Sequence, residues 1–362
     1  MTEGTCQVRT PWLARNCGVG RLAHTGAVPE IPYDVTGVPD ELTEETAKFV
    51  ARANCVDAVR RYTEGQYGGD VHRALATAVA ARVRVGRRRV LLPGTQRLLR
   101  VAWQTEAAAR FADASDDSLL QRVSAQTLPV QTYYAVFNAF RAMTAASGAP
   151  VDQHSALQED FAKNRTAKMP LPWSVTLTGD PDDPASCRLT PAITVPEAFN
   201  PVSTKHEPED YVWAALRMAR RWKVEVARRE WIKHHRRSNG QAYKALPKGK
   251  RAEIVTKLRP TTILDFIYEL RRQANYETAD EYASDANDAQ VARFHTGMTF
   301  LTDTGLLLAE ASIAAYCGFD ALNRAAEEWQ SSTKRLGEWA AAPLRRRLDA
   351  ISGSVAVPPA SV

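Results

Sequence analysis

The chain has 362 residues, of which 44% are apolar and 24% are charged. This balance excludes general disorder and allows two or three domain-sized units, or one domain with a large insertion. The net charge of +6 comes from 47 Lys and Arg against 41 Asp and Glu. So small an excess matters for function only where the basic residues cluster.

The cysteines and the apolar segments indicate a cytoplasmic protein. Five cysteines, an odd number, occur without any Cys-x-x-Cys pair, which argues against a disulfide framework or a zinc site and favours reduced thiols. The N-terminus lacks the charged and apolar regions of a signal peptide. The longest apolar run, 305–319, is too short to span a bilayer and contains Glu310. We therefore expect no membrane partner.

The first third of the chain predicts an arm followed by helices. Residues 1–40 carry four prolines and scattered glycines and predict an irregular arm. Apolar residues at helical spacing then predict three helices, over about 41–62, 71–82 and 96–113. Residues 83–92 alternate at first and favour a short strand that ends at a Pro93-Gly94 turn. We group 1–123 as an N-terminal arm and helical region.

A helix expected over about 130–142 carries two neighbouring stripes of side chains. One stripe is apolar and includes Tyr133 and Phe137. The second stripe is polar and consists of Gln131, Tyr134, Asn138 and Arg141. Spacing of three and four residues places each stripe on one face, so the helix should bury one face and offer the other to a ligand.

The middle of the chain reads as an insertion, over 165–259. It begins with a proline-rich stretch in which 173–178 alternates and predicts one arm of a short β-hairpin. A helix is expected over about 208–235, and a basic turn over 247–251.

The remaining elements are helical, so we expect a mainly α fold. A helix should begin after Thr262, because Asp265 follows three residues later in an arrangement like a capping box. Further helices are expected over about 285–316 and 322–351, followed by a flexible tail over 352–362. One shared core should bury Phe137, Phe140, Ile263, Ile267, Phe294, Met298 and Leu301.

The order of several motifs resembles the HEPN family (higher eukaryotes and prokaryotes nucleotide-binding domain). The run 133–142, followed by Gly148 and then His154, is similar to the first two helices of that family. The segment 270–276 resembles its third helix, and 285–316 fits its fourth. The resemblance implies a four-helix core formed by 124–164 and 260–351. The long gap between these two parts departs from the family pattern.

The resemblance implies two kinds of function. Some HEPN proteins are metal-independent ribonucleases with an Arg-x(4–6)-His motif, often acting as dimers, and others bind nucleotides or partner proteins. In this chain the matching spacing joins Arg229 to His234, which lie in the insertion rather than in the last helices. His154 is the other candidate base, since histidine titrates near neutral pH. Arg141 or Arg272 would balance charge on the phosphate.

Basic residues cluster between 217 and 259. This stretch holds fifteen basic and three acidic residues, a net charge of +12, with Trp222 and Trp231 among them. Clustered cations bind a phosphate backbone, and aromatic rings stack on unpaired bases. The alternative is a solvated helix face with its tryptophans in the core. The candidate nucleic-acid contacts are Arg220, Arg221, Arg228, Arg236, Arg237, Lys248, Lys250 and Arg251. A second basic cluster lies between 82 and 100.

Two function classes stay open. The first is an RNA-directed protein of a bacterial toxin or anti-phage defence system, with metal-independent ribonuclease activity as one form. The second is a non-catalytic module in which the polar stripe and Arg272 face a nucleotide or a partner protein, and a homodimer through the helical core fits either class. The chain has no phosphate-binding glycine loop and no metal-ligand motif, so no cofactor is expected. Catalysis is favoured if Arg229 and His234 face the polar stripe or a dimer partner's copy of it, and binding if they are splayed on an outer face.

Overall fold

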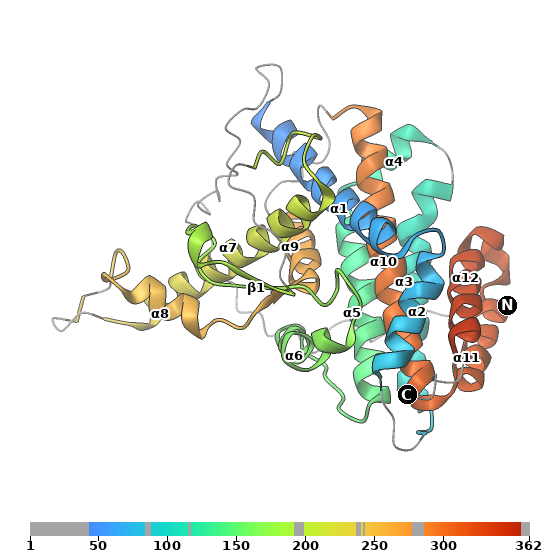
Figure 1. Cartoon of the computed structure of the whole chain (residues 1–362). Coiled ribbons are helices and arrows are strands. Elements are labelled where there is room, and N and C mark those ends of the chain that lie inside the picture. Colours follow the sequence, from blue (N-terminus) through green and yellow to red (C-terminus); the bar gives the residue numbers. More distant parts are fainter. Residues whose placement is uncertain are drawn as a thin grey trace, which may run out of the picture. The chain divides into compact units, whose positions relative to one another are not determined.

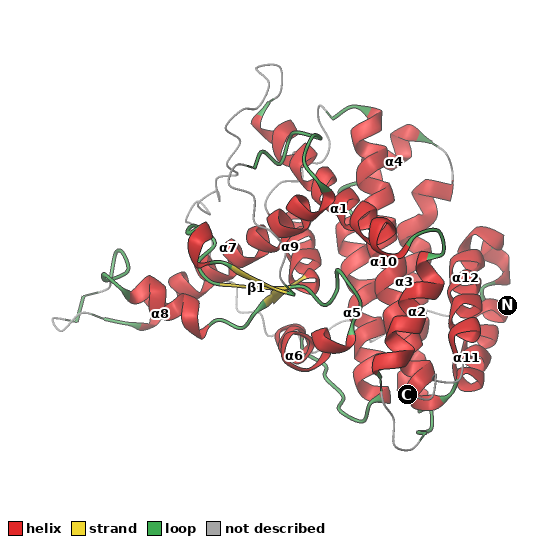
Figure 2. Ribbon diagram, in the orientation of Figure 1, coloured by secondary structure: helices red, strands yellow, loops and turns green. Residues whose placement is uncertain are grey.

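The computed structural model describes residues 43–83, 88–114, 117–191, 199–236, 240–241, 243–276 and 286–355. The expected N-terminal arm, Arg237 and the end of the tail lie outside these residues. The described chain is mainly helical with three short strands, as predicted (Figure 2). None of the described helices is long and apolar enough to cross a membrane.

Helix α10 (Asp288–Cys317) lies at the centre of the core (Figure 1). The helices packed against it are α1 (Glu44–Tyr67), α2 (Val71–Arg82), α3 (Pro93–Ala114), α4 (Ser118–Ser124), α5 (Leu128–Ala146), α11 (Phe319–Ser332) and α12 (Glu338–Val355). Helix α3 also runs along α5, and α12 packs on α2. The N-terminal helices therefore share one hydrophobic core with the later ones.

Local sequence explains where α10 begins and why its neighbours pack so closely. The Asn287 side chain accepts a hydrogen bond from the backbone of Gln290, and the Gln290 side chain accepts one from the backbone of Asn287, which closes a capping box. A Cβ atom at Gly297 would lie 2.7 Å from the backbone nitrogen of Asp57 in α1. Because glycine has no Cβ, α1 can pack directly on α10 at this point.

The shared core expected from the sequence is confirmed. Helix α9 (Ile263–Tyr276) packs on α5. The backbone amide of Thr262 donates to Asp265 at 2.8 Å, which supports the predicted cap of α9. All seven predicted core residues belong to one buried cluster, namely Phe137, Phe140, Ile263, Ile267, Phe294, Met298 and Leu301.

The insertion carries a small antiparallel sheet, as the alternation over 173–178 indicated. Its strands are β1 (Thr176–Thr178), β2 (Arg188–Thr190) and β3 (Thr261–Thr262), in the order β2-β1-β3. Because β3 immediately precedes α9, the sheet joins the insertion to the core. Helix α7 (Pro208–His234) packs on α1 and α9, and α8 (Lys250–Lys257) follows it.

Buried charges also join α7 to α9. Lys223 donates to Asp265 at 3.0 Å, and Arg259 donates to the same carboxylate at 2.6 Å. Burial lowers the pKa of Lys223 to about 8, although the charge of Asp265 opposes this shift. The carboxylate is thus held by the α9 cap and by two cations from the insertion.

Several expected boundaries were wrong. Pro93 begins α3 instead of ending a strand, since proline suits the first turn of a helix. The described part of 83–92 contains no strand. The helix expected over 322–351 is two helices, α11 and α12, because the chain reverses through Gly337 at φ +87°. The basic turn at 247–251 leads into α8, and α4 was not expected.

Candidate functional site

His154 lies at the start of a short helix that faces α5. This helix, α6 (His154–Asp160), continues as a π-helical turn over Phe161–Arg165. The imidazole of His154 stacks on the ring of Phe137, with the centroids 4.1 Å apart. Its Nδ1 lies 2.7 Å from the hydroxyl of Tyr133. The histidine is half-buried.

Arg271 of α9 completes this site from the opposite side. Its guanidinium donates to the hydroxyl of Tyr134 at 2.9 Å. The same group lies over the rings of Tyr133, Tyr134 and Tyr268, at 5.3 to 5.7 Å from their centroids. These are cation–π distances. The sequence interpretation chose Arg272 and missed Arg271, although Tyr268 and Arg271 stand three residues apart and so share a face of α9.

The polar stripe of α5 continues the site toward Arg141. Arg141 donates to Asp152 at 2.6 Å and to Asn138 at 3.4 Å. Asn138 in turn donates to the backbone carbonyl of Tyr134 at 2.8 Å. Gln131 is half-buried one turn before Tyr134. The structure therefore places Tyr134, Asn138 and Arg141 near His154, and we call Tyr133, Tyr134, Arg141, His154 and Arg271 the His154 site.

Electrostatics fix the protonation of the His154 site. Burial lowers the pKa of His154, and the charges of Arg271 and Arg141 lower it further, so the imidazole is neutral at pH 7. Burial raises the pKa of Tyr133, so its phenol keeps its proton. The phenol proton is satisfied when it is donated to Nδ1 of His154, and the imidazole then carries its own proton on Nε2. In this tautomer the site presents an Nε2–H donor.

Two guanidinium groups of the His154 site are incompletely bonded. The Nε atoms of Arg141 and Arg271 are buried, and neither has a hydrogen-bond partner among the residues that the structure describes. Buried polar groups are nearly always paired. The site therefore has spare hydrogen-bond donors in addition to Nε2–H of His154.

Arg272 faces away from the His154 site. It donates to both carboxylate oxygens of Glu269, at 2.9 and 2.6 Å, and its guanidinium lies 3.4 Å from the ring centroid of Trp222 in α7. The side chain is buried. Arg272 therefore holds α7 against α9, and the structure reassigns it from ligand contact to packing.

The structure does not bring Arg229 and His234 to the His154 site. Arg229 donates to Glu225 at 2.8 Å and lies over Trp222. His234 is exposed, with Nε2 3.1 Å from Glu230 on the same helix. In Figure 1 the C-terminal part of α7 runs toward α8 and away from α5 and α6. The arrangement that would favour catalysis by this pair is not present within the described chain.

Many of the clustered cations of α7 and α8 are already paired. Arg220 is only 1% exposed and donates to three backbone carbonyls, of Gly179, Val255 and Arg259, so it is structural rather than available to a nucleic acid. The other ion pairs join Arg221 and Arg251 to Asp182, Arg251 to Asp180, Arg228 to Glu225, and Lys250 to Glu253. These carboxylates offset much of the positive charge counted in the sequence.

An exposed basic surface remains at the tip formed by the end of α7 and the start of α8. The ring of Trp231 stacks on His235, with centroids 4.3 Å apart, and lies 5.1 Å from Tyr243. Lys250 lies over the same ring at 5.3 Å. Exposed cations of the same segment include Lys233, Arg236 and Lys248. We call these seven residues the basic tip.

The second basic cluster is only partly free. Arg82 donates to the backbone carbonyl of Met169 at 2.8 Å, and Arg100 pairs with Glu328. The exposed members are Arg82, Arg88, Arg89 and Arg97, while Arg84 and Arg87 lie outside the described residues.

Within the described ranges, no group of three or more His, Cys, Asp and Glu side chains is arranged to hold a metal ion.

Comparisons with protein-family models, with curated proteins and with solved structures found no match to this chain. The class of this protein is therefore described by its fold and by the residues of its site. The chain is a mainly α-helical protein with a half-buried histidine–tyrosine–arginine site between α5, α6 and α9.

Proposed function

We propose that this chain binds single-stranded RNA at the His154 site, as a HEPN-like helical protein of a bacterial toxin or anti-phage defence system. The observation that carries this proposal is the position of Arg271 over three tyrosine rings, near enough to His154 for its charge to lower the pKa of the imidazole. A cation and aromatic rings side by side match the two parts of an unpaired nucleotide. The guanidinium suits the phosphate, and a tyrosine ring suits a base.

The donors of the site fit a phosphate group in number and type. Arg141 and Arg271 are cations, and each retains an unpaired Nε–H. Guanidinium groups match phosphate oxygens in geometry as well as in charge. Nε2–H of His154 adds a neutral donor between them. Asp152 already accepts from Arg141 at 2.6 Å, so an RNA phosphate would compete with this exposed carboxylate.

Binding is favoured over cleavage by the tautomer of His154. A general base that removes a 2′-OH proton needs a free lone pair, whereas the nitrogen of His154 that faces away from Tyr133 carries a proton. The separate position of Arg229 and His234 also favours binding. Metal-independent cleavage is the second candidate, because a neutral imidazole beside two arginines is the composition that such a reaction requires.

The test is fluorescence anisotropy with a labelled single-stranded RNA at several salt concentrations. Arg271→Gln should weaken binding at least tenfold and should reduce the salt slope by about 0.7, the value for one lost phosphate contact. Arg324 is exposed on α11, and Arg324→Gln is the matched control that should bind as the unchanged protein does. Equal binding by both variants would refute the His154 site as the RNA site.

Cleavage is tested separately by incubating the same RNA with and without a chelator. We expect intact RNA on a denaturing gel. Cleavage that persists with chelator and disappears in His154→Ala would support the ribonuclease instead. Absence of RNA binding at every salt concentration would favour the nucleotide- or partner-binding alternative.

A further inference from the structure

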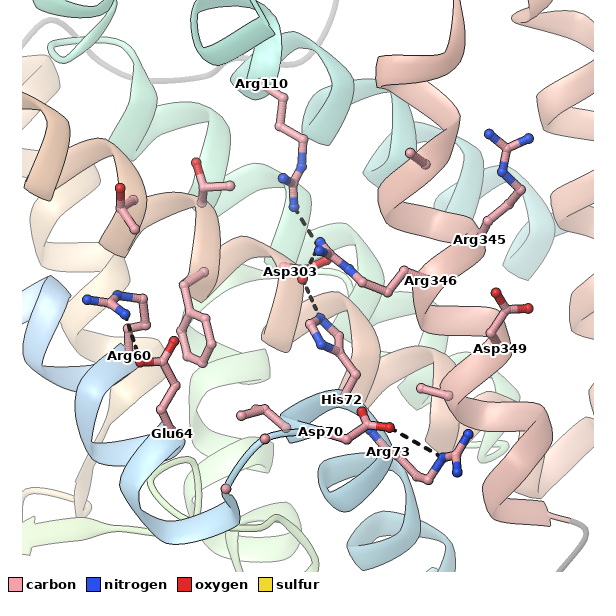
Figure 3. A pocket seen from close by; sticks show the side chains of 18 residues that line it. Arg60, Glu64, Asp70, His72, Arg73, Arg110, Asp303, Arg345, Arg346 and Asp349 are labelled. Carbon is pink, nitrogen blue, oxygen red and sulfur yellow. Dashed lines mark hydrogen bonds and ion pairs between the residues drawn. The ribbon is translucent and has the colours of Figure 1, made fainter.

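A cleft of about 1140 Å³ lies between α1, α2, α10 and α12, on helices other than those of the His154 site (Figure 3). Its lining includes the end of α1, the turn through Gly68 and Gly69, the first residues of α2, and one face each of α10 and α12. Phe300, Val71 and two alanines of α12 contribute apolar surface. The volume is that of a site for a small organic molecule and exceeds the space needed by a single inorganic ion.

Guanidinium groups enter this cleft from three sides. The arginines that line it are Arg60, Arg73, Arg110, Arg345 and Arg346. In Figure 3 Arg60 lies on the α1 wall, Arg73 and Arg345 lie on the opposite side, and Arg346 and Arg110 converge near the middle. The heads of Arg73 and Arg346 are 63% and 56% exposed. These two cations are therefore accessible to a ligand.

Asp303 and His72 meet at the floor of the cleft. Nε2 of His72 lies 2.5 Å from one oxygen of Asp303, and the guanidinium of Arg346 lies 3.2 Å from the same oxygen. Burial alone would raise the pKa of Asp303, but the hydrogen bond from His72 and the charges of Arg347 and Arg110 hold it well below its usual range. The carboxylate is therefore ionised. It binds Nε2 of His72 and so fixes the orientation of the imidazole ring.

A buried ion network supports this floor. Arg347 is fully buried and donates to Asp303 at 2.8 Å, to Glu106 at 2.7 and 2.8 Å, and to Glu310 at 2.8 and 3.0 Å. Trp103 donates to Glu310 at 2.8 Å. Arg347 holds one oxygen of Asp303, and the other oxygen faces His72 and Arg346 at the floor of the cleft.

Carboxylates lie beside each arginine of the cleft. Glu64 accepts from Arg60 at 2.7 Å, and Asp70 lies 3.5 Å from Arg73 across exposed surface. Asp349 lines the cleft beside Arg345 and Arg346, one turn away on α12. Arg60 also donates to Asp57 at 2.7 Å, Arg110 lies 3.1 Å from Glu106, and Arg345 pairs with Glu338. Arg73 and Arg346 therefore have the two most exposed guanidinium heads of the lining. An anionic ligand is the occupant that such a lining favours.

We propose that this cleft binds a nucleotide-sized phosphorylated small molecule, whose phosphate is held by Arg73 and Arg346. The planar forks of two arginines match phosphate oxygens, and Asp303 holds Nε2 of His72 at the floor of the cleft. The remaining volume and the apolar side of the cleft accommodate the organic part of the ligand. The proposal shares no residue with the His154 site and does not depend on RNA binding there.

The test is isothermal titration of the full chain with three probes: ATP, inorganic phosphate and citrate. ATP should bind, phosphate should bind more weakly, and citrate should not compete with ATP. Arg73→Gln and Arg346→Gln should each weaken ATP binding at least tenfold. Arg324→Gln and Arg271→Gln should leave it unchanged. Circular dichroism and thermal unfolding of each variant establish that the fold is retained.

Four outcomes would overturn the proposal. They are absence of ATP binding, unchanged binding in folded Arg73→Gln and Arg346→Gln variants, displacement of ATP by citrate at equal concentration, and loss of ATP binding in Arg271→Gln. The last result would move the phosphate to the His154 site. Failure of RNA binding with retention of ATP binding would refute the proposed function and leave the cleft proposal intact.

Discussion

The hydroxyl oxygen of Tyr133 lies 2.7 Å from Nδ1 of His154, and this pair decides which imidazole nitrogen carries the proton. Burial raises the pKa of Tyr133 and lowers that of His154, so a neutral phenol donates to a neutral ring. Tyr133→Phe removes this donor, so both neutral tautomers of His154 should be populated in the variant. Nitrogen NMR of the imidazole should show Nε2–H in the unchanged protein and a mixture in the variant. RNA affinity should fall by about 2- to 10-fold, the range for one lost hydrogen bond. Identical spectra would contradict the assignment.

The lowered pKa of His154 predicts how stability changes with pH. In the unfolded chain this histidine titrates near pH 6.5, and in the folded chain it takes up its proton only at a lower pH. Between these values the unfolded state binds more protons, so stability falls as pH decreases below about 6.5. His154→Gln should remove this part of the acid sensitivity. Urea unfolding of both proteins at pH 7.5 and pH 5.5 measures the difference, and an unchanged difference would contradict the role of His154.

Phe137 joins the core to the His154 site. The side chain is 5% exposed and stacks on both Tyr133 and His154. Phe137→Ala should therefore lower the free energy of unfolding by about 3–5 kcal/mol. Phe111, also on a helix, is 58% exposed, and Phe111→Ala should change stability by about 0.5 kcal/mol or less. Equal losses of unfolding free energy in the two variants would show that burial of the side chain does not determine the loss.

Helical periodicity explains why much of the fold could be predicted from the sequence. The expected helix over 71–82 has the same bounds as α2, and the ends of α7 and α10 were placed within about three residues. The two stripes of α5 depend only on the spacing of residues along one helix. The residues of its polar face could therefore be named before any tertiary contact was known. His154 was named because of its position after Gly148, which resembles the pattern of the HEPN family.

Long-range partners explain what the sequence did not reveal. Arg271 and Arg272 are neighbours, about 100° apart around α9, and only the packing of α7 decides that Arg272 meets Trp222 while Arg271 meets the tyrosines. The carboxylates of Asp180 and Asp182, which pair with Arg251, lie about 70 residues before it. His72 and Asp303 are separated by 231 positions. No local pattern reports such contacts, so the cleft was missed and the free charge of the basic region was overestimated.

Ion pairing predicts which basic residues control salt-dependent RNA binding. Lys233, Arg236 and Lys248 of the basic tip are exposed, and replacing all three with Gln should flatten the salt slope by up to about 2, since each lost phosphate contact contributes about 0.7. Arg228 and Arg229 share Glu225 as a partner, so replacing this pair should change the slope less. The measurement is RNA anisotropy between 50 and 300 mM salt. An equal change in both variants would show that pairing with Glu225 does not restrict these arginines.

The buried guanidinium of Arg347 should be essential for stability. Arg347→Met keeps a similar volume but leaves Glu106, Asp303 and Glu310 with no fully buried cation between them, and removing one partner of a buried ion pair typically costs about 3–5 kcal/mol. The matched control is Arg345→Met, because Arg345 is 44% exposed and surface ion pairs contribute about 1 kcal/mol or less. The uncompensated carboxylates should also titrate at a higher pH in the folded variant. The folded variant then binds more protons than its unfolded chain, so the deficit relative to the unchanged protein should shrink as pH falls from 7 toward 5. Urea unfolding across this range measures both effects, and a deficit that is small at pH 7, or that grows on acidification, would contradict this account of the network.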